Sequence, residues 1–408
     1  MRRGRAECEL RPAAPFSFKR LRRLCVMKTI YLDYNATTPI DPAVVEAMLP
    51  YLREQFGNPS STHVYGRTAH EAVEQSRQQV ADLLGAQEGE IVFTSGGTEA
   101  SNHALKGAVF AKLQGIFGRW AKDAHIITSA VEHPATLEPC AFLKRLGCRI
   151  TILPVDKYGS VDPEAVRKAI DRKTTLVSIM HANNEVGTVQ PIREIAAIAH
   201  ERGVLVHSDA AQSLGKISVD VNELGVDLLS MAGHKLYAPK GVGALFVREG
   251  VKLEPFIHGA GHEGGRRAGT ENVPYVVALG TACELARKSI PAATERLRQL
   301  RDWLWERLQS GLEDRITLNG HPEHRLPNTL NVNLAGQVGA DFLQTVPEIA
   351  ASTGSACHAG HITMSPVLAA MGVPPHLGRG AVRLSVGRFT TEEEVDRAVE
   401  VMIKRLFP

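Results

Sequence analysis

The chain contains 408 residues, of which 44% are hydrophobic and 22% are charged, a composition typical of a globular protein long enough for two domains. No apolar run approaches the roughly 18 residues needed to cross a bilayer, so we expect no membrane-spanning helix and no membrane partner. The formal net charge is +3, but residues 1–26 carry +6 through eight Lys or Arg and two Glu, which leaves −3 elsewhere and argues against direct nucleic-acid binding.

Residues 1–26 are rich in arginine, contain a single serine and have no long apolar core. We expect them to be a disordered extension, or to reflect a start assigned too early, because the first segment with an ordered pattern, KTIYLDYNATTP, directly follows Met27. A transit peptide is the alternative, since such peptides are rich in arginine and poor in acidic residues. The segment is excluded from the fold prediction in either case.

Cysteine usage indicates a reducing compartment. The sequence has no CxxC motif and no paired cysteine spacing, which favours free thiols and a cytoplasmic location over a disulfide framework. The six cysteines are Cys8, Cys25, Cys140, Cys148, Cys283 and Cys357.

Short apolar runs alternate with helical patterns from residue 41 to about residue 250. Asp41-Pro42 is typical of a helix start, and Gly85 is typical of a helix end. Strands that alternate with helices predict an α/β fold, with a mostly parallel sheet flanked by helices on both faces. The predicted strands are residues 90–94, 125–129, 149–155, 175–180, 204–210, 227–232 and 243–247, and the predicted helices include residues 42–54, 66–84, 98–110 and 191–203.

The pattern changes beyond roughly residue 289. A long charged helix is predicted at residues 294–312 and a strand at residues 328–334. The chain closes with a helix that Thr391 is expected to cap. These elements predict a smaller α+β domain.

The first stretch with a chemical implication is SGGTEAS, residues 95–101, between a predicted strand and a predicted helix. Its small residues let backbone N–H groups close around a phosphate, the helix N-terminus adds a favourable dipole, and Thr98 adds a hydroxyl. The stretch is neither a Walker loop nor GxGxxG. By itself it favours an ordinary glycine-rich turn over a phosphate site.

An aspartate and a lysine follow two of the predicted strands. Asp209 comes where one strand ends, with Gln212 one turn later, and Lys235 follows His234 in a turn of small residues after the next strand. Open α/β sheets present ligand-binding residues at such ends, although Asp209 alone could be only a helix cap. Lysine is the amine that forms a Schiff base with a carbonyl cofactor. Together with the phosphate loop upstream, this order favours pyridoxal phosphate, with Lys235 on the aldehyde and Asp209 on the ring nitrogen.

The stretch STGSACHAGH, residues 352–361, places Cys357 beside His358, with His361 three residues further on. One thiolate and two imidazoles suggest a zinc site, but spacing this short seldom supplies the whole ligand set, and no fourth-ligand motif appears. A reactive nucleophile and an inert buried thiol are the other interpretations. The stretch alone does not decide among the three.

Taken together, the motifs resemble those of the cysteine desulfurases, a class V aminotransferase-like group of fold-type I pyridoxal-phosphate enzymes. The resemblance extends from about residue 29 to the C-terminus, and so many short motifs in one order make a chance match improbable. In family order, the motifs are YLDYNATTP, FGNPSSTH, FTSGGTEASN, VEHPA, HANNEVG, SDAAQ, GHK, RRAGTEN, GSACH and VRLSVGRFT.

The resemblance implies a large domain that binds pyridoxal phosphate over residues 42–288. Residues 27–41 and 289–408 would form the smaller α+β domain, which carries the Cys357 loop. The resemblance also implies a homodimer, because Thr270, in RRAGTEN, would reach the phosphate bound by the neighbouring subunit.

The resemblance assigns roles around the cofactor ring. Lys235 would bind the cofactor's aldehyde, Asp209 would pair with the ring nitrogen, and Gln212 would approach the ring oxygen. His133, in VEHPA, would stack on the ring and shuttle protons.

Other residues would hold the phosphate and the substrate. Thr98 and the backbone at Gly97 would bind the phosphate, with help from His234. Asn184, which would also contact the cofactor, and Arg383 would fix the substrate carboxylate, and a guanidinium fork independently suits that task.

The reaction implied by the resemblance converts L-cysteine to L-alanine and leaves the sulfur on Cys357 as a persulfide. A scaffold or carrier protein, in iron–sulfur cluster or other sulfur-cofactor assembly, would then accept the sulfur. Cys357 is accordingly interpreted as the nucleophile, no metal is expected, and the roles of His358 and His361 stay open. Many family members carry a phosphate-binding serine where this chain has Ala232, which predicts a modestly looser cofactor.

Two alternatives differ in class from this prediction. A selenocysteine lyase, or another class V aminotransferase-like enzyme, would share Lys235 and Asp209, but Cys357 in a loop of small residues favours the desulfurase. A non-catalytic binding module is disfavoured because every catalytic position is filled.

Overall fold

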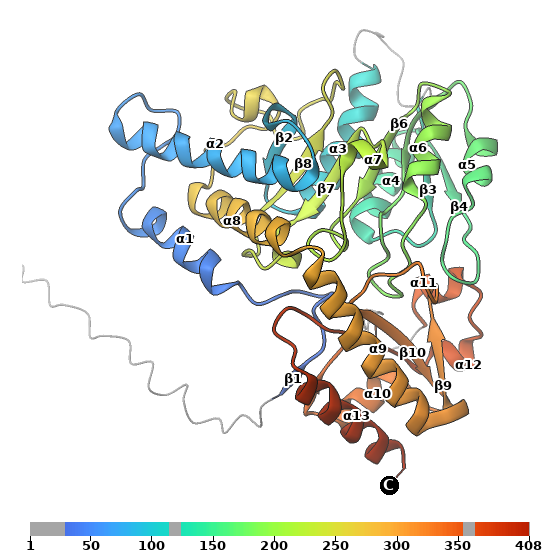
Figure 1. Cartoon of the computed structure of the whole chain (residues 1–408). Coiled ribbons are helices and arrows are strands. Elements are labelled where there is room, and N and C mark those ends of the chain that lie inside the picture. Colours follow the sequence, from blue (N-terminus) through green and yellow to red (C-terminus); the bar gives the residue numbers. More distant parts are fainter. Residues whose placement is uncertain (1–28, 114–123, 354–363, 408) are drawn as a thin grey trace, which may run out of the picture.

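The computed structural model describes residues 29–113, 124–353 and 364–407, and Figure 1 shows the course of the chain. Local sequence signals set several helix ends. The Asp41 side chain accepts a hydrogen bond from the main-chain nitrogen of Ala43, so α1 (Pro42–Arg53) begins where the Asp-Pro pair predicts. The next helix, α2 (Val64–Leu84), ends at Gly85, whose φ of 68° is left-handed.

The larger sheet within these ranges has seven strands. The run from β7 to β4 is parallel throughout, whereas β8 is antiparallel to the strand on either side of it. In spatial order, the strands are β2 (Ile91–Thr94), β8 (Gly243–Val247), β7 (Leu228–Ala232), β6 (Leu205–Asp209), β5 (Thr174–Ser178), β3 (His125–Ser129) and β4 (Arg149–Leu153).

Helices pack on both faces of this sheet, because successive strand residues point to opposite sides. In β2, Val92 packs in one buried cluster with α3 (Gly97–Leu113) and α4 (Pro134–Arg145), whereas Ile91 and Phe93 pack in the cluster on the other face. The helices that contribute to this second cluster are α1, α2, α5 (Pro163–Ala169), α6 (Ile192–His200), α7 (Val221–Leu224) and α8 (Val273–Ser289).

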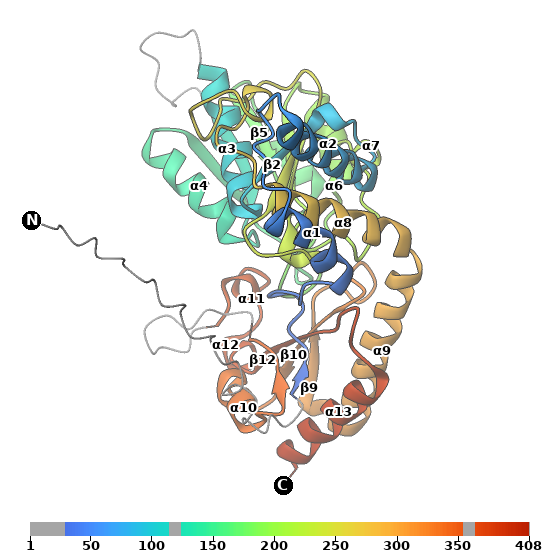
Figure 2. The ribbon, with the colours of Figure 1, turned by 90° about the vertical axis from the view of Figure 1, so that its left-hand side faces the viewer.

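A three-stranded antiparallel sheet forms the centre of the other part of the molecule, in the order β12 (Ala381–Ser385), β10 (Thr329–Leu334) and β9 (Ile316–Asn319). Figure 2 shows α9 (Ala292–Leu312) running from the end of α8 alongside this sheet toward α13 (Glu392–Leu406). One face of α9 is apolar at helical spacing and packs in a buried cluster with residues of this sheet and of α13. Its members from α9 are Leu297, Leu300, Leu304, Leu308 and Leu312.

The remaining elements are short. The two-stranded pair of β1 and β11 is parallel and joins the N-terminal segment to the small part. The bounds of these elements are β1 (Ile30–Tyr31), β11 (Ile349–Ala350), α10 (Gly339–Thr345), α11 (Pro366–Ala370) and α12 (Pro375–Gly378), with single 3₁₀ turns η2 (Glu88–Glu90), η4 (Gly233–Lys235), η5 (Glu263–Gly265) and η6 (Glu313–Arg315).

The predicted fold class is confirmed: the chain is α/β, with a mostly parallel sheet between helices and a smaller α+β part. The predicted cap of the last helix is confirmed as well, since the Thr391 hydroxyl accepts a hydrogen bond from the Glu394 nitrogen in a capping box. The division into domains at residues 41/42 and 288/289 stays a prediction. None of the helices in the described ranges is long and apolar enough to cross a membrane.

The parallel arrangement brings distant parts of the sequence to one edge of the large sheet. Asp209 is the last residue of β6, and Ala232 is the last residue of β7, directly before the turn η4 that contains Lys235. The N-terminus of α3 and the segment after β3 lie at the same end, because carboxyl ends of parallel strands share one edge.

Candidate active site

A cavity of about 260 Å³ opens at this edge of the sheet. It collects residues from six separate segments of the chain, so it exists only in the folded protein. Its lining residues are Ala36, Gly97, Thr98, His133, Ala135, Met180, Ala182, Asn184, Asp209, Ala211, Gln212, Ala232, His234 and Lys235. Eight of the residues predicted from sequence are therefore brought together here.

Lys235 reaches the cavity from η4 and meets the N-terminal segment. Its Nζ donates hydrogen bonds to the main-chain oxygens of Asn35 and Ala36, the second at 3.0 Å. Thr38 secures the same turn, since its hydroxyl donates to the His234 carbonyl and accepts from the Tyr237 nitrogen, each at 3.0 Å. Burial, followed by the charge of Arg383, lowers the pKa of Lys235 to about 8. An amine with such a pKa is available as a nucleophile or base near neutral pH.

Asp209 presents a buried carboxyl group to the cavity from the end of β6. One carboxylate oxygen accepts a hydrogen bond from the Ala211 nitrogen at 2.9 Å, which fixes the side chain. Burial raises the pKa of Asp209, against the opposing effects of that hydrogen bond and of His133 and Lys235. A cation beside this carboxyl group would favour its charged form, so the site suits a protonated ring nitrogen.

His133 is held in place as the N-cap of α4. Its Nδ1 accepts a hydrogen bond from the Ala135 nitrogen at 3.1 Å, which in the neutral ring leaves the proton on Nε2. Burial lowers the pKa of His133, with the charge of Asp209 opposing this effect. A neutral, oriented imidazole that lines the cavity is equipped to pass protons.

The N-terminus of α3 contributes to the lining of the cavity. A β-carbon placed on Gly97 would lie 3.2 Å from the Ala232 β-carbon, so small residues at both positions let the two backbones approach closely. The first N–H groups of a helix lack intrahelical acceptors and attract anions. Thr98, in the first turn of α3, and His234 line the same cavity. Burial and the charges of Lys235 and Lys240 lower the pKa of His234 to about 4, so it is neutral near pH 7.

Arg383 lies beside the cavity rather than in its lining. Its Nη1 donates to the main-chain oxygen of Asn184 at 2.9 Å, and its Nη2 donates to the Asp33 carboxylate at 2.8 Å. The guanidinium is almost fully buried, and its Nε has no hydrogen-bond partner among the described residues. Arg383 is therefore hydrogen-bonded to a residue that lines the cavity, Asn184, without lining the cavity itself.

Besides Arg383, one further predicted site residue among those described does not line this cavity. Thr270 lines a different cavity of about 240 Å³, together with Ser95 and Arg267. Cys357, with His358 and His361, falls outside the described residues. Among the residues that are described, no cluster of three His, Cys, Asp or Glu side chains is placed to hold a metal ion.

Sequence reasoning missed the contribution of the N-terminal segment. Asp33 pairs with Arg383, and the Asn35 main-chain oxygen accepts from both Lys235 and Gln212. The motif YLDYNATTP contains both residues, but it precedes the first predicted helix and carries no strand-end signal. Its polar residues alone indicated no partner, because their partners lie 177 to 350 residues away in sequence.

Residues 30–398 match the model of the family described as aminotransferase class-V. The chain belongs to this family. Within it, the chain is a member of the cysteine desulfurases: it is 47% identical over 377 residues to the cysteine desulfurase IscS of Dictyoglomus turgidum, covering 92% of this chain and 94% of that protein. The resemblance stated from the sequence motifs is therefore confirmed.

Solved structures of this family have the same fold. A structure described as a NifS-like protein superposes with a TM-score of 0.85 at 37% identity, and covers 93% of this chain and 99% of that one. A structure described as SspA in complex with cysteine superposes with a TM-score of 0.77 at 36% identity, and covers 89% of this chain and 100% of that one.

Proposed function

We propose that this protein uses pyridoxal phosphate to convert L-cysteine to L-alanine, and that it retains the sulfur as a persulfide on Cys357. The observation that carries the proposal is the convergence of Lys235, Asp209 and His133 on one cavity at the carboxyl edge of the sheet. Membership of the cysteine desulfurases supports the choice of reaction. The relative solved in complex with cysteine supports the choice of substrate.

The residues around the cavity fit pyridoxal phosphate. Lys235 supplies an amine for the aldehyde, Asp209 a buried carboxyl group for the ring nitrogen, and His133 a flat ring to stack on the cofactor. The first turn of α3 and the Thr98 hydroxyl suit the phosphate, and the small residues Gly97 and Ala232 let the two backbones approach closely there. Gln212 would donate to the ring oxygen. The serine hydroxyl that many relatives use is replaced by Ala232, so cofactor binding is expected to be modestly weaker.

The cofactor, when bound, withdraws electrons from the substrate and makes the proton on its Cα acidic. Lys235, whose pKa of about 8 leaves a useful fraction of free amine at neutral pH, accepts that proton at Nζ. Arg383 and Asn184 hold the substrate carboxylate, and the unpartnered Nε of Arg383 is consistent with a ligand at this position. The Cys357 thiolate attacks the substrate sulfur, so an S–S bond forms and the C–S bond breaks. The electron pair of that bond stays with the carbon skeleton, which is protonated and leaves as alanine.

The described residues on either side of the Cys357 segment support its place in this reaction. Ser352 forms a β-bridge with Arg383, the residue assigned to the substrate carboxylate. Ser365 donates a hydrogen bond to the carboxylate of Glu185, the direct neighbour of Asn184. Both ends of the segment that contains Cys357 are therefore anchored beside the candidate site.

We infer that the protein acts as a homodimer. Thr270 lines a cavity separate from that of Lys235, which agrees with a role at the site of a second subunit. Large apolar side chains are also exposed around the connection from α1 to α2: Phe56 is 76% exposed and stacks on Tyr65, which is 54% exposed, with ring centroids 5.6 Å apart. A cluster of exposed apolar side chains on a globular protein is typical of a subunit interface.

We also propose a cytoplasmic location and a scaffold or carrier protein as the sulfur acceptor. The cysteines in the described ranges, Cys140, Cys148 and Cys283, are buried and unpaired, which suits a reducing compartment. A persulfide on Cys357 needs a second protein to receive its sulfur, and nothing in the described residues identifies that protein.

Purified protein tests the proposal directly. Incubation with L-cysteine should give alanine in a one-to-one ratio with sulfur, and the protein should show a visible absorption band from the lysine-bound cofactor. Lys235→Ala should lose both the band and the turnover. Absence of the band in the unaltered protein would contradict the proposal, and faster release of selenide from selenocysteine than of sulfide from cysteine would favour a selenocysteine lyase.

A further inference from the structure

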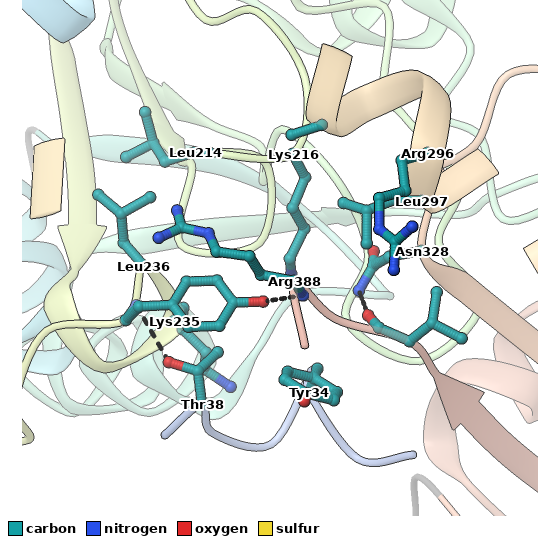
Figure 3. Close-up of a pocket in the computed structure, with 14 residues that line it drawn as sticks. Tyr34, Thr38, Leu214, Lys216, Lys235, Leu236, Arg296, Leu297, Asn328 and Arg388 are labelled. Carbon is teal, nitrogen blue, oxygen red and sulfur yellow. Dashed lines mark hydrogen bonds between the residues drawn. The ribbon is translucent and has the colours of Figure 1, made fainter. Parts of the chain in front are cut away.

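A second lysine is buried close to Lys235. Lys216 lies in the turn after β6, its side chain is 5% exposed, and it lines a small cavity of about 50 Å³ together with Lys235 and Asn328 (Figure 3). Burial, reinforced by the charges of Lys235 and Arg383, lowers the pKa of Lys216 well below that of an ordinary lysine. Its hydrogen-bond partners among the described residues are the amide oxygens of Asn35 and Gln212 rather than carboxylates, so Lys216 donates hydrogen bonds there and forms no ion pair with them.

The hydrogen bonds of Lys216 fix the orientation of Gln212. Lys216 Nζ donates to Gln212 Oε1 at 2.9 Å, and Gln212 Nε2 donates to the main-chain oxygen of Asn35 at 3.0 Å. A main-chain oxygen only accepts, so the amide nitrogen must face Asn35 and the amide oxygen must face Lys216. The amide nitrogen carries a second hydrogen, and Gln212 lines the catalytic cavity. With its oxygen held by Lys216, Gln212 can therefore offer the cavity a donor but not an acceptor.

Lys216 also holds Asn35, which connects three parts of the site. The Asn35 Oδ1 accepts from Lys216 Nζ at 3.3 Å and from Asn328 at 3.0 Å. Its Nδ2 donates to the main-chain oxygen of Asn184 at 3.2 Å, and its own main-chain oxygen accepts from Lys235 as well as from Gln212. Asn35 is 1% exposed, so these bonds are made without competition from water.

We propose that Lys216 is a positioning residue that keeps the Gln212 amide turned with its nitrogen toward the cofactor's ring oxygen. The proposal rests on the proposed function, since it requires pyridoxal phosphate at Lys235. It concerns a residue that does not line the catalytic cavity itself and acts only through Gln212 and Asn35. If Lys216 is removed, the Gln212 oxygen loses its hydrogen-bond donor. The amide can then rotate, so that its nitrogen no longer donates to the cofactor's ring oxygen.

The test is a pH titration of the visible absorption band in the cofactor-loaded protein. A donor to the ring oxygen stabilises its negative charge, so losing that donor makes the lysine-bound cofactor hold its proton to higher pH. Lys216→Met should raise the midpoint of the titration by roughly 0.4 to 1 pH unit, the equivalent of one neutral hydrogen bond. It should also weaken cofactor binding by roughly threefold to tenfold.

Two further variants separate positioning from a general loss of packing. Gln212→Met should shift the midpoint in the same direction, and adding Lys216→Met to it should cause no further shift, because the two residues act as one unit. Lys252→Met makes the same chemical change at an exposed lysine and should leave the midpoint where it is.

Each outcome decides the proposal. An unchanged midpoint in Lys216→Met, or shifts that simply add in the double variant, would overturn it. If Lys216→Met fails to fold, Gln212→Met alone still tests the proposal. An unshifted midpoint in Gln212→Met would show that Gln212 does not donate to the ring oxygen, so Lys216 could not act through it. If the unaltered protein shows no visible band at all, it is the proposed function that fails, and the two failures are thereby distinguished.

Discussion

Arg383 donates to Asp33 through Nη2 at 2.8 Å, so a residue of the last strand is held by the segment that precedes the first helix. The guanidinium is oriented by two hydrogen bonds before any substrate arrives. We expect Arg383→Lys to raise the KM for cysteine by about tenfold to a hundredfold, because lysine lacks the planar fork that matches a carboxylate. Steady-state kinetics over a range of cysteine concentrations measures this effect.

Arg388 provides the matched control for this variant. Its Nη1 pairs with Asp41 at 2.6 Å, outside the lining of the catalytic cavity. Arg388→Lys should therefore leave the KM within about twofold, an effect typical of a residue away from the substrate. Equal changes in KM for the two variants would refute the assignment of the substrate carboxylate to Arg383.

The pKa of Lys235 predicts how fast the cofactor is captured at each pH. Only the unprotonated amine attacks an aldehyde, and its fraction rises with pH through the pKa of about 8, whereas an ordinary lysine would need a pH near 10.5. The rate of pyridoxal phosphate uptake by cofactor-stripped protein should therefore increase with pH and reach half its maximum near pH 8. Stopped-flow absorbance follows the reaction, and a midpoint near pH 10 would be incompatible with the burial of this amine.

Arg383 offers an internal check on the same pKa. Its positive charge is the second cause of the lowered pKa of Lys235, after burial. Removing that charge in Arg383→Ala should raise the pKa of Lys235, so the midpoint for cofactor uptake should move to higher pH. A midpoint that moves to lower pH would show that the sign of this interaction is wrong.

His133 has a structural task and a proposed chemical one, and two substitutions separate them. Asparagine is a good N-cap, so His133→Asn should keep the free energy of unfolding nearly unchanged while lowering kcat by about a hundredfold to ten-thousandfold. His133→Ala should lose the cap as well, which costs about 1 kcal/mol of stability. Urea unfolding and turnover measured on both variants check the two effects. Normal turnover of the asparagine variant would exclude His133 as a proton carrier.

The exposed aromatic pair tests the inferred dimer. Phe56→Ser combined with Tyr65→Ser removes apolar surface that is expected to be buried between subunits, so the molar mass in solution should shift from that of two chains toward one. Phe407→Ser, at another exposed aromatic residue, should leave the mass unchanged. Multi-angle light scattering reads both, and a monomeric unaltered protein would contradict the inference.

Sequence alone predicted the fold well where a local signal exists. The helices begin at Asp41 and Thr391 and end at Gly85 as expected, because caps depend on a few neighbouring residues. The parallel sheet then explains why Asp209 and Lys235, each at the end of its own strand, meet in one cavity.

The parts that sequence did not predict depend on long-range pairing. Asp33 and Asn35 reach Arg383 and Gln212 only in the folded chain, and in the sequence neither residue follows a predicted strand or lies in a glycine-rich loop. Lys216 gives no signal in the sequence either, since a lysine in a turn is ordinarily exposed, and only its burial distinguishes it.

The central claim is that sulfur passes through Cys357, and persulfide mapping tests it most directly. The protein is incubated with L-cysteine, persulfides are trapped by alkylation, and the labelled residues are located by mass spectrometry. We predict a persulfide on Cys357 and none on the buried Cys140, Cys148 or Cys283, and we predict that Cys357→Ala keeps the visible cofactor band but transfers no sulfur to an acceptor thiol. Undiminished sulfur transfer by Cys357→Ala, or a persulfide on another cysteine alone, would contradict the account.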